Sequence, residues 1–176
     1  MDIAIGSTAD AARVAEFGRR SFVEAFGEQN SPQHLQEYVD SAFSVETLRQ
    51  EILDPDAHFF LAHGDDGELL GYAKLCANRP IDCVADPSPF QIERIYVDQH
   101  TQSRGVGGRL LTHAMRVAES NGGRTIWLSV WNINASARRF YERHGFDVVG
   151  ETYFMLGPER QDDVVMARSI AGLATA

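Results

Sequence analysis

Residues 90–111, FQIERIYVDQHTQSRGVGGRLL, place an apolar strand, a short polar link and a glycine-rich turn directly before a helix. Glycine in the first turn of a helix costs about 1 kcal/mol relative to alanine, so the turn at 104–108 needs a role that offsets this cost. The first backbone N–H groups of a helix have no internal partner, and the helix dipole adds partial positive charge beside them. Glycines let an anion approach these groups closely.

The glycine spacing narrows the kind of anion site that the turn can form. A P-loop would continue with Gly-Lys-Ser/Thr, and this turn does not. A dinucleotide-binding turn would have another glycine spacing and an acidic strand end about twenty residues further on. The turn therefore predicts a different phosphate or diphosphate site, to which Arg104 and Arg109 add charge-assisted contacts. Tight packing of the helix on the strand is the alternative.

The composition describes an ordinary globular chain with an acidic balance. Its 176 residues are expected to form one domain over 1–170, followed by a short tail at 171–176. Sixteen Lys and Arg against 25 Asp and Glu give a net charge of −9, which would repel nucleic acid. No run approaches the roughly 20 apolar residues of a membrane span, and no secretory signal precedes the first strand. We expect a cytoplasmic protein with no membrane or nucleic-acid partner.

The cysteines and histidines do not indicate a metal site. Cys76 and Cys83 form no C-x-x-C motif, and the six histidines lack the spacing of metal ligands. We therefore expect reduced thiols and no metal.

The hydrophobic patterns predict a mixed α/β chain. Strands are expected at 2–5, 58–64, 68–77, 90–98, 125–131, 146–156 and 162–170, and helices at 14–25, 32–43, 44–53, 105–120 and 134–145. The turn at 65–67 joins two strands as a hairpin, and strand 125–131 lacks alternation, so both of its faces are expected to be covered. This order favours a mixed, mostly antiparallel central sheet flanked by helices, with parallel connections around the last two helices.

At the glycine turn the chain resembles the GCN5-related N-acetyltransferases, the GNAT family. Their acetyl-CoA motif, Gln/Arg-x-x-Gly-x-Gly/Ala, is matched by Gln102-Ser103-Arg104-Gly105-Val106-Gly107. The resemblance implies that acetyl-CoA is the cosubstrate and that the amides of this turn, which continues to Gly108, hold its diphosphate. It also implies that backbone groups of Ile95, Tyr96 and Val97 pair with the pantetheine arm like an added strand.

A second block, NINASARRFYERHGF, matches the family pattern Asn-x-x-Ala-x-x-Phe-Tyr-x-x-x-Gly-Phe from residue 134 to residue 146. Asn134 is a helix cap by position and, by resemblance, a ligand of the pantetheine arm. Tyr141 has the chemistry of a general acid, since a phenol with a pKa of about 10 can protonate a departing thiolate. The alternative for Tyr141 is an aromatic side chain that fills the cleft beside Phe140.

Both ends of the chain resemble one branch of this family, the PaiA-type spermidine/spermine N-acetyltransferases of bacteria. FGEQNSPQHLQEYVDSAF and FMLGPERQDDVVMARSI carry this likeness, so the resemblance covers about residues 3–170. It implies the acyl-CoA N-acyltransferase fold and acetyl transfer to a primary amine, with polyamines as the acceptor class.

Transfer to a primary amine requires a group that removes the proton of the amine, because the pKa of such an amine is near 10. Glu93 is the predicted base, since it lies on the apolar strand before the turn, where burial would raise its pKa. An ion pair with an arginine such as Arg94 or Arg124 is the alternative. A backbone N–H near Val97 would stabilise the oxyanion, and Gln91 on the face of Glu93 could hold a water. No serine or cysteine lies in a nucleophile motif, which favours direct transfer.

Acidic residues gather between residues 24 and 56, where eight carboxylates stand against Arg49 alone. By resemblance this segment forms a wall of the acceptor cleft, and such charge attracts a polycation. Tyr38, Phe43 or Tyr153 are candidates to line the methylene groups of that substrate. A solvated acidic face is the alternative.

Other functions stay open. The acceptor is alternatively a protein or peptide N-terminus or an amine antibiotic, or the chain is a non-catalytic regulator that binds acyl-CoA. A homodimer formed through a sheet edge also stays open.

Overall fold

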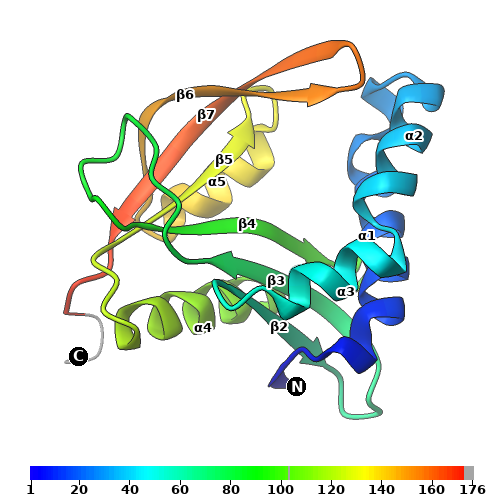
Figure 1. Cartoon of the computed structure of the whole chain (residues 1–176), viewed down its shortest axis with the longest axis horizontal. Helices are drawn as coiled ribbons and strands as arrows, with labels where there is room; N and C mark the ends of the chain where they lie inside the picture. Colours follow the sequence, from blue (N-terminus) through cyan, green and yellow to red (C-terminus); the bar gives the residue numbers. More distant parts are fainter. Residues whose placement is uncertain (103, 173–176) are drawn as a thin grey trace.

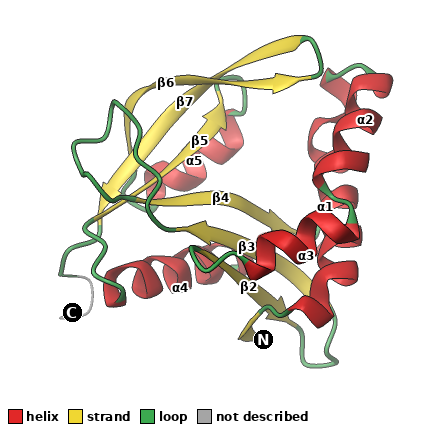
Figure 2. Cartoon of the chain, viewed as in Figure 1, coloured by secondary structure: helices red, strands yellow, loops and turns green. Residues whose placement is uncertain are grey.

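The computed structural model describes residues 1–102 and 104–172, which form a seven-stranded sheet with helices on both faces (Figures 1 and 2). The strands are β1 (Asp2–Ile5), β2 (Ala57–His63), β3 (Leu69–Cys76), β4 (Phe90–Val97), β5 (Thr125–Trp131), β6 (Asp147–Leu156) and β7 (Glu159–Ser169). The α-helices are α1 (Ala11–Phe26), α2 (Pro32–Ala42), α3 (Val45–Leu53), α4 (Val106–Ser120) and α5 (Ala135–Arg143). Short 3-10 turns lie at Thr8–Asp10, Gly27–Gln29 and Gln99–Thr101.

The strand order β1-β2-β3-β4-β5-β7-β6 confirms the predicted mixed, mostly antiparallel sheet. Only β4 and β5 are parallel neighbours among the described strands, and α4 connects them. Helix α5 connects β5 to β6, but β7 lies between these two strands. The second predicted parallel connection therefore joins strands that are not adjacent.

The two faces of the sheet carry separate hydrophobic cores. Helices α4 and α5 cover one face, where Leu110, Ile126 and Leu128 are buried. Helices α1, α2 and α3 cover part of the other face, where Phe43 and Tyr72 are buried. The loop at 77–89 packs over the rest of that face, on the β5 and β7 side. Both faces of β5 are thus covered up to Leu128, as its lack of alternation predicted, whereas Ser129 is exposed.

Local signals located most element boundaries correctly. The β2–β3 hairpin forms, and α2 begins at Pro32 with Ser31 as its N-cap residue. β7 begins at Glu159, earlier than the predicted residue 162, because pairing with β6 continues to the turn at Gly157. In the part of the chain that the structure describes, no helix is both long and apolar enough to cross a membrane.

β4 departs from regular pairing at Glu93. Lys74 of β3 faces Arg94, whereas Leu75 faces Ile92, so Glu93 is an extra residue in the ladder. Such a bulge bends and twists a strand. On its other edge β4 pairs with β5 only at residues 90 and 91. The two parallel strands therefore diverge towards their C-terminal ends, and this opening positions the site.

Candidate active site

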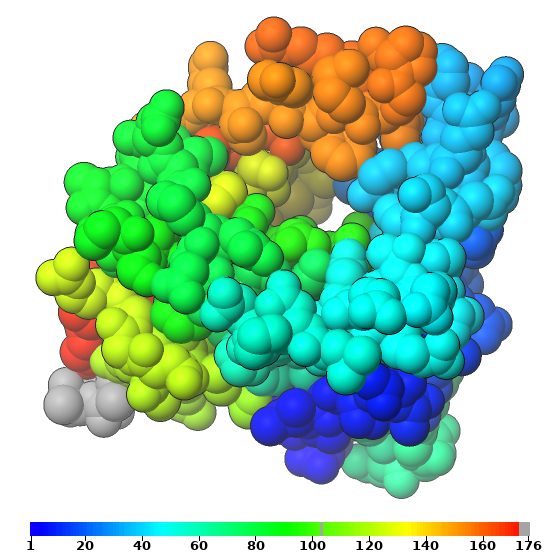
Figure 3. Space-filling view, in the orientation of Figure 1, coloured from blue at the N-terminus to red at the C-terminus, as the bar shows by residue number. Residues whose placement is uncertain are grey.

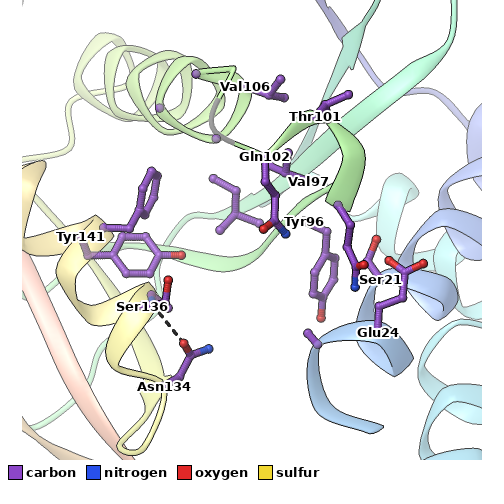
Figure 4. A pocket seen from close by; sticks show the side chains of 18 of the residues that line it. Ser21, Glu24, Tyr96, Val97, Thr101, Gln102, Val106, Asn134, Ser136 and Tyr141 are labelled. Atoms are coloured by element: carbon purple, nitrogen blue, oxygen red, sulfur yellow. Dashed lines mark hydrogen bonds between the residues drawn. The ribbon is translucent and has the colours of Figure 1, made fainter. Parts of the chain in front are cut away.

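A cavity of about 660 Å³ lies where β4 and β5 diverge (Figure 4). The end of α1, the end of β4, the first turn of α4 and helix α5 border it. The predicted cofactor-binding residues that line it are Ile95, Tyr96, Val97, Gln102, Gly105, Val106, Gly107, Gly108, Asn134 and Tyr141. Ser103 lies outside the described residues. Two motifs that are separate in the sequence thus meet at one cavity.

The first turn of α4 has the properties of an anion site. Gly105 caps the helix with a φ of 79°, a left-handed conformation that costs other residues about 1–2 kcal/mol. The Arg109 N–H donates to the Gly105 carbonyl at 3.0 Å. Within the described residues, no carbonyl accepts the N–H groups of Val106, Gly107 or Gly108. Three donors at the positive end of a helix dipole fit a diphosphate.

The basic side chains beside this turn differ from those expected. Arg104 is exposed and does not line the cavity, and Arg109 donates from Nη2 to the Met1 carbonyl at 3.0 Å. Arg143 and His144, at the end of α5, line the cavity instead. The charge beside the anion site therefore comes from the second motif and not from the glycine turn.

His144 was missed because its sequence context gave no metal or catalytic pattern. Its Nδ1 lies 2.7 Å from the Phe140 carbonyl oxygen, which can only accept, so Nδ1 carries the proton. A methyl group on Gly108 would lie 3.1 Å from Nε2, which shows how close the ring is to the start of α4. Ala137, Phe140 and His144 follow one helix face at i, i+3 and i+7, and this spacing was the available signal.

The backbone of β4 is unpaired on the side of the cavity. β3 pairs with its other edge, where Tyr72 faces Tyr96 and Gly71 faces Val97. Over the described strands, β5 pairs with none of residues 92–97. An unpaired strand edge offers alternating N–H and C=O groups to an extended chain that contains amides. This edge has the form expected for binding a pantetheine arm.

Tyr141 lies on α5 with its hydroxyl directed into the cavity (Figure 4). The residue is 6% exposed, and its ring packs against Phe140 and Phe146 with centroids 5.0 Å and 5.8 Å away. No described residue forms a hydrogen bond with the hydroxyl. Burial raises the pKa of Tyr141, so the phenol stays protonated at neutral pH. The ring of Tyr141 therefore packs beside Phe140, as the structural alternative predicted. Its hydroxyl is at the same time available to donate a hydrogen bond, as the general-acid role requires.

Asn134 caps α5, as its position predicted. Its Oδ1 accepts from the Ala137 N–H at 3.0 Å, the dashed line in Figure 4. Its Nδ2 has no partner among the described residues, and the side chain lines the cavity. One end of the amide holds the helix, and the other end is available to a ligand.

Glu93 lies outside the lining of the cavity, beside a buried cation. Its Oε1 is 2.6 Å from Lys74 Nζ and 3.6 Å from Arg94 Nη2. Burial by itself raises the pKa of Glu93, but the hydrogen bond and charge of Lys74, followed by the charge of Arg94, outweigh it and lower the pKa. The expected rise of this pKa is therefore wrong in direction, because the β3–β4 register brings Lys74 to it. Arg124 instead lies 3.9 Å from Asp86.

The C-terminal half of helix α1 contributes a further wall, which includes the first residues of the acidic segment at 24–56. Ser21 and Glu24 line the cavity (Figure 4), and Phe26 lines it as well. Ser21 Oγ is buried and has no hydrogen-bond partner among the described residues. The Glu24 carboxylate lies 3.9 Å from Arg20. Ser21 and Glu24 share a helix face at i and i+3. Glu24 belongs to the acidic segment that was expected to form a wall of the acceptor cleft, whereas Ser21 was not predicted to lie at the site.

Most other carboxylates of the acidic segment are neutralised by cations. Ion pairs join Arg19 with Asp40, Arg49 with Glu46, Arg79 with Asp54, and both Lys74 and Arg94 with Glu51. Glu24 is the member of this segment that lines the cavity. Phe43 is fully buried in the core and cannot line a cleft, while Tyr153 is exposed on β6.

The surface is hollowed between β4, the end of β5 and helices α1 and α2 (Figure 3).

Comparisons with known proteins identify the family. Residues 19–146 match the model of the acetyltransferase (GNAT) family. An uncharacterized N-acetyltransferase of Lactobacillus delbrueckii subsp. lactis is 32% identical over 152 residues, which cover 86% of this chain and 87% of that protein. Streptothricin acetyltransferase of Streptomyces lavendulae is 35% identical over 97 residues, which cover 55% of this chain and 48% of that protein.

A solved structure has the same fold. The PaiA N-acetyltransferase from Thermoplasma acidophilum, crystallised in complex with coenzyme A, matches with a TM-score of 0.76 over 96% of this chain and 99% of that chain, at 22% identity. The fold implied by the resemblance is thereby confirmed. Since the family model spans more than half of the sequence, the chain belongs to the GNAT family of acetyltransferases and is an acetyl-CoA-dependent N-acetyltransferase.

Proposed function

We propose that this enzyme moves the acetyl group of acetyl-CoA directly to a primary amine, with a polyamine such as spermidine or spermine as the preferred acceptor. The observation that carries the proposal is the meeting of three features in one cavity: the free amides of α4, the unpaired edge of β4 and the hydroxyl of Tyr141. Glu24 adds a carboxylate to the wall formed by α1, which favours a cationic acceptor.

The lining residues divide naturally between the parts of acetyl-CoA. The amides of Val106, Gly107 and Gly108 would hold the diphosphate, with Arg143 beside them. The free edge of β4 at residues 95–97 would pair with the pantetheine arm, and Asn134 Nδ2 would donate to one of its carbonyls.

Bound acetyl-CoA supplies a thioester, whose carbonyl carbon forms a bond to the amine nitrogen while its bond to sulfur breaks. The amine must lose one proton and the departing thiolate must gain one. Tyr141 donates its proton to the sulfur. Its raised pKa means that the phenol is protonated before the transfer. Glu93 is ionised at neutral pH, although its lowered pKa makes it a weaker base than an ordinary carboxylate. It accepts the amine proton through water, since it does not line the cavity itself.

An amine antibiotic is the second candidate acceptor. The similarity to streptothricin acetyltransferase favours it, although the matching region covers about half of that protein. We also propose a cytoplasmic location, which the free thiols of Cys76 and Cys83 support.

An assay for released CoA thiol separates these functions. The panel contains spermidine, spermine, an aminoglycoside, streptothricin, a peptide with a free N-terminus and a reaction without acceptor. The polyamines are expected to give the highest kcat/KM. A higher value for an antibiotic or for the peptide would replace the polyamine. Tight acetyl-CoA binding without any acceptor-dependent release would instead indicate a regulator.

A further inference from the structure

Asp163 is a buried carboxylate that pairs with no cation of the described residues. It lies on β7 and is 8% exposed. No Lys, Arg or His of the described residues forms an ion pair with it, whereas the neighbouring Asp162 is exposed and lies 3.0 Å from Arg160. An ionised carboxylate is costly to bury without a partner. A cationic ligand that bound beside Asp163 would therefore supply the missing partner of this carboxylate.

The pairing of β7 shows which way Asp163 faces. Val165 and Ala167 pack with Trp127 under the loop at 77–89, whereas Met166 belongs to the core beneath α4 and α5. By alternation, Asp163 points to the side of Val165, away from α4 and α5. Glu93 pairs with Lys74, which also pairs with Glu51 of α3, so Glu93 lies on this same side of the sheet. Asp163 therefore faces the side opposite the helix that carries the anion site.

Asp163 also lies near one end of the cavity. Its partner across the sheet is Trp131, the last residue of β5. The rings of Trp131 and Phe26 have centroids 6.2 Å apart, and Phe26 lines the cavity. Figure 3 shows the surface hollowed in this region, between the end of β5 and helices α1 and α2. Asp163 does not line the cavity itself, but it lies at the strand end beside this border of the cavity.

The electrostatics of Asp163 agree with a missing cation. Burial raises the pKa of Asp163, the Ser129 hydroxyl lowers it, and the negative charge of Asp162 raises it further, so the net shift is upward. Ser129 lies on β5, two residues before Trp131 and on the same face of the sheet. A cation beside Asp163 would favour the ionised form and offset the cost of its burial.

We propose that Asp163, assisted by the Ser129 hydroxyl, binds a second positive charge of the acceptor, at a distance from the amine that is acetylated. This inference rests on the proposed function and names the residue that makes a diamine or polyamine a better substrate than a monoamine. The distal ammonium donates to the carboxylate, and the hydroxyl of Ser129 orients that carboxylate. Asp163 is thus a specificity-determining residue that takes no part in the chemical step.

The test compares two acceptors that differ only in the distal amine, 1,4-diaminobutane and butylamine. The parent enzyme is expected to have the higher kcat/KM with the diamine. Asp163→Asn keeps the shape of the side chain and removes its charge, and it is expected to lower the ratio of the two kcat/KM values at least tenfold, mainly through the KM of the diamine. Asp162→Asn removes the neighbouring, exposed carboxylate and is the matched control, in which the ratio stays as in the parent.

Both kcat/KM values are measured on one protein sample. Partial unfolding of a variant lowers both values by the same factor and leaves their ratio unchanged. Should Asp163→Asn fail to fold, Ser129→Ala at an exposed position is expected to lower the same ratio by a smaller factor. An unchanged ratio in Asp163→Asn, or in Ser129→Ala where that variant replaces it, overturns the inference. An equal loss with both amines also overturns it. Failure of the proposed function looks different, since the parent enzyme would then release no CoA thiol with any amine, or would have a higher kcat/KM with an antibiotic or the peptide than with the polyamines.

Discussion

Replacing Gly105 with alanine tests the anion site at the start of α4. Gly105 has a φ of 79°, and a Cβ built on it would meet no atom within 4 Å, so the variant has strain but no clash. The left-handed conformation should cost about 1–2 kcal/mol of unfolding free energy. For a chain of this size, that corresponds to a fall in Tm of about 2–8 °C. The new methyl group would also point into the space beside the free amides.

Gly122, just after the end of α4, provides a matched control. It has a φ of 82°, and a Cβ built there would also meet nothing within 4 Å. Gly122→Ala should therefore lose the same stability in urea unfolding. It lies about 25 Å from Gly105 along the helix, given a rise of about 1.5 Å per residue. The two variants thus share the backbone strain and differ in their distance from the anion site.

Calorimetric titration with acetyl-CoA separates the two effects. Loss of a charge-assisted hydrogen bond costs about 1.5–3 kcal/mol, which is roughly a 10- to 150-fold weaker Kd. Gly105→Ala is expected to show a loss of this size, and Gly122→Ala is expected to bind as the parent does. If both variants bind acetyl-CoA with the parent affinity, the diphosphate does not lie at this turn.

Three further substitutions test the other parts of the site. Tyr141→Phe should lower turnover by about 10²-fold with little change in acetyl-CoA affinity or stability, because the hydroxyl bonds to no described residue; parent-like CoA thiol release would place the proton donor elsewhere. Asn134→Ala and the control Ser44→Ala each remove a helix cap and should each cost about 1 kcal/mol in urea unfolding, but only the first should weaken acetyl-CoA binding in calorimetry. If both bind alike, Asn134 is a cap alone. Glu93→Gln should reduce the loss of stability between pH 7 and pH 3, because a lowered folded pKa stabilises the protein above the unfolded pKa of about 4.3 and this contribution is lost as the pH falls through the folded value. An equal loss in urea unfolding of variant and parent would contradict the ion pair with Lys74.

Several parts of the site could be predicted because they depend on residues close together in the chain. The cap at Asn134 needs only the N–H of Ala137, three residues later. The left-handed turn at Gly105 and the free amides after it follow from the way any helix begins. The position of Tyr141 follows from its place on the same short helix as that cap.

Other parts could not be predicted, because they depend on how distant segments are paired. The bulge in β4 brings Lys74 to Glu93, and this contact lowers a pKa that burial alone would raise. The α1 wall follows from packing across the sheet, so Ser21 and Glu24 resemble ordinary helix positions in the sequence. The burial of Asp163 likewise depends on the register of β7 between β5 and β6.

The sequence by itself determined a strand, a glycine turn and a helix whose first amides are free, together with the cap and phenol of the second motif. These features are set by backbone geometry within a few residues. Only the tertiary structure decided that β4 and β5 diverge, that both motifs meet at the resulting cavity and which carboxylates have cations beside them. Strand register and helix packing control those outcomes, since both act between residues far apart in the chain.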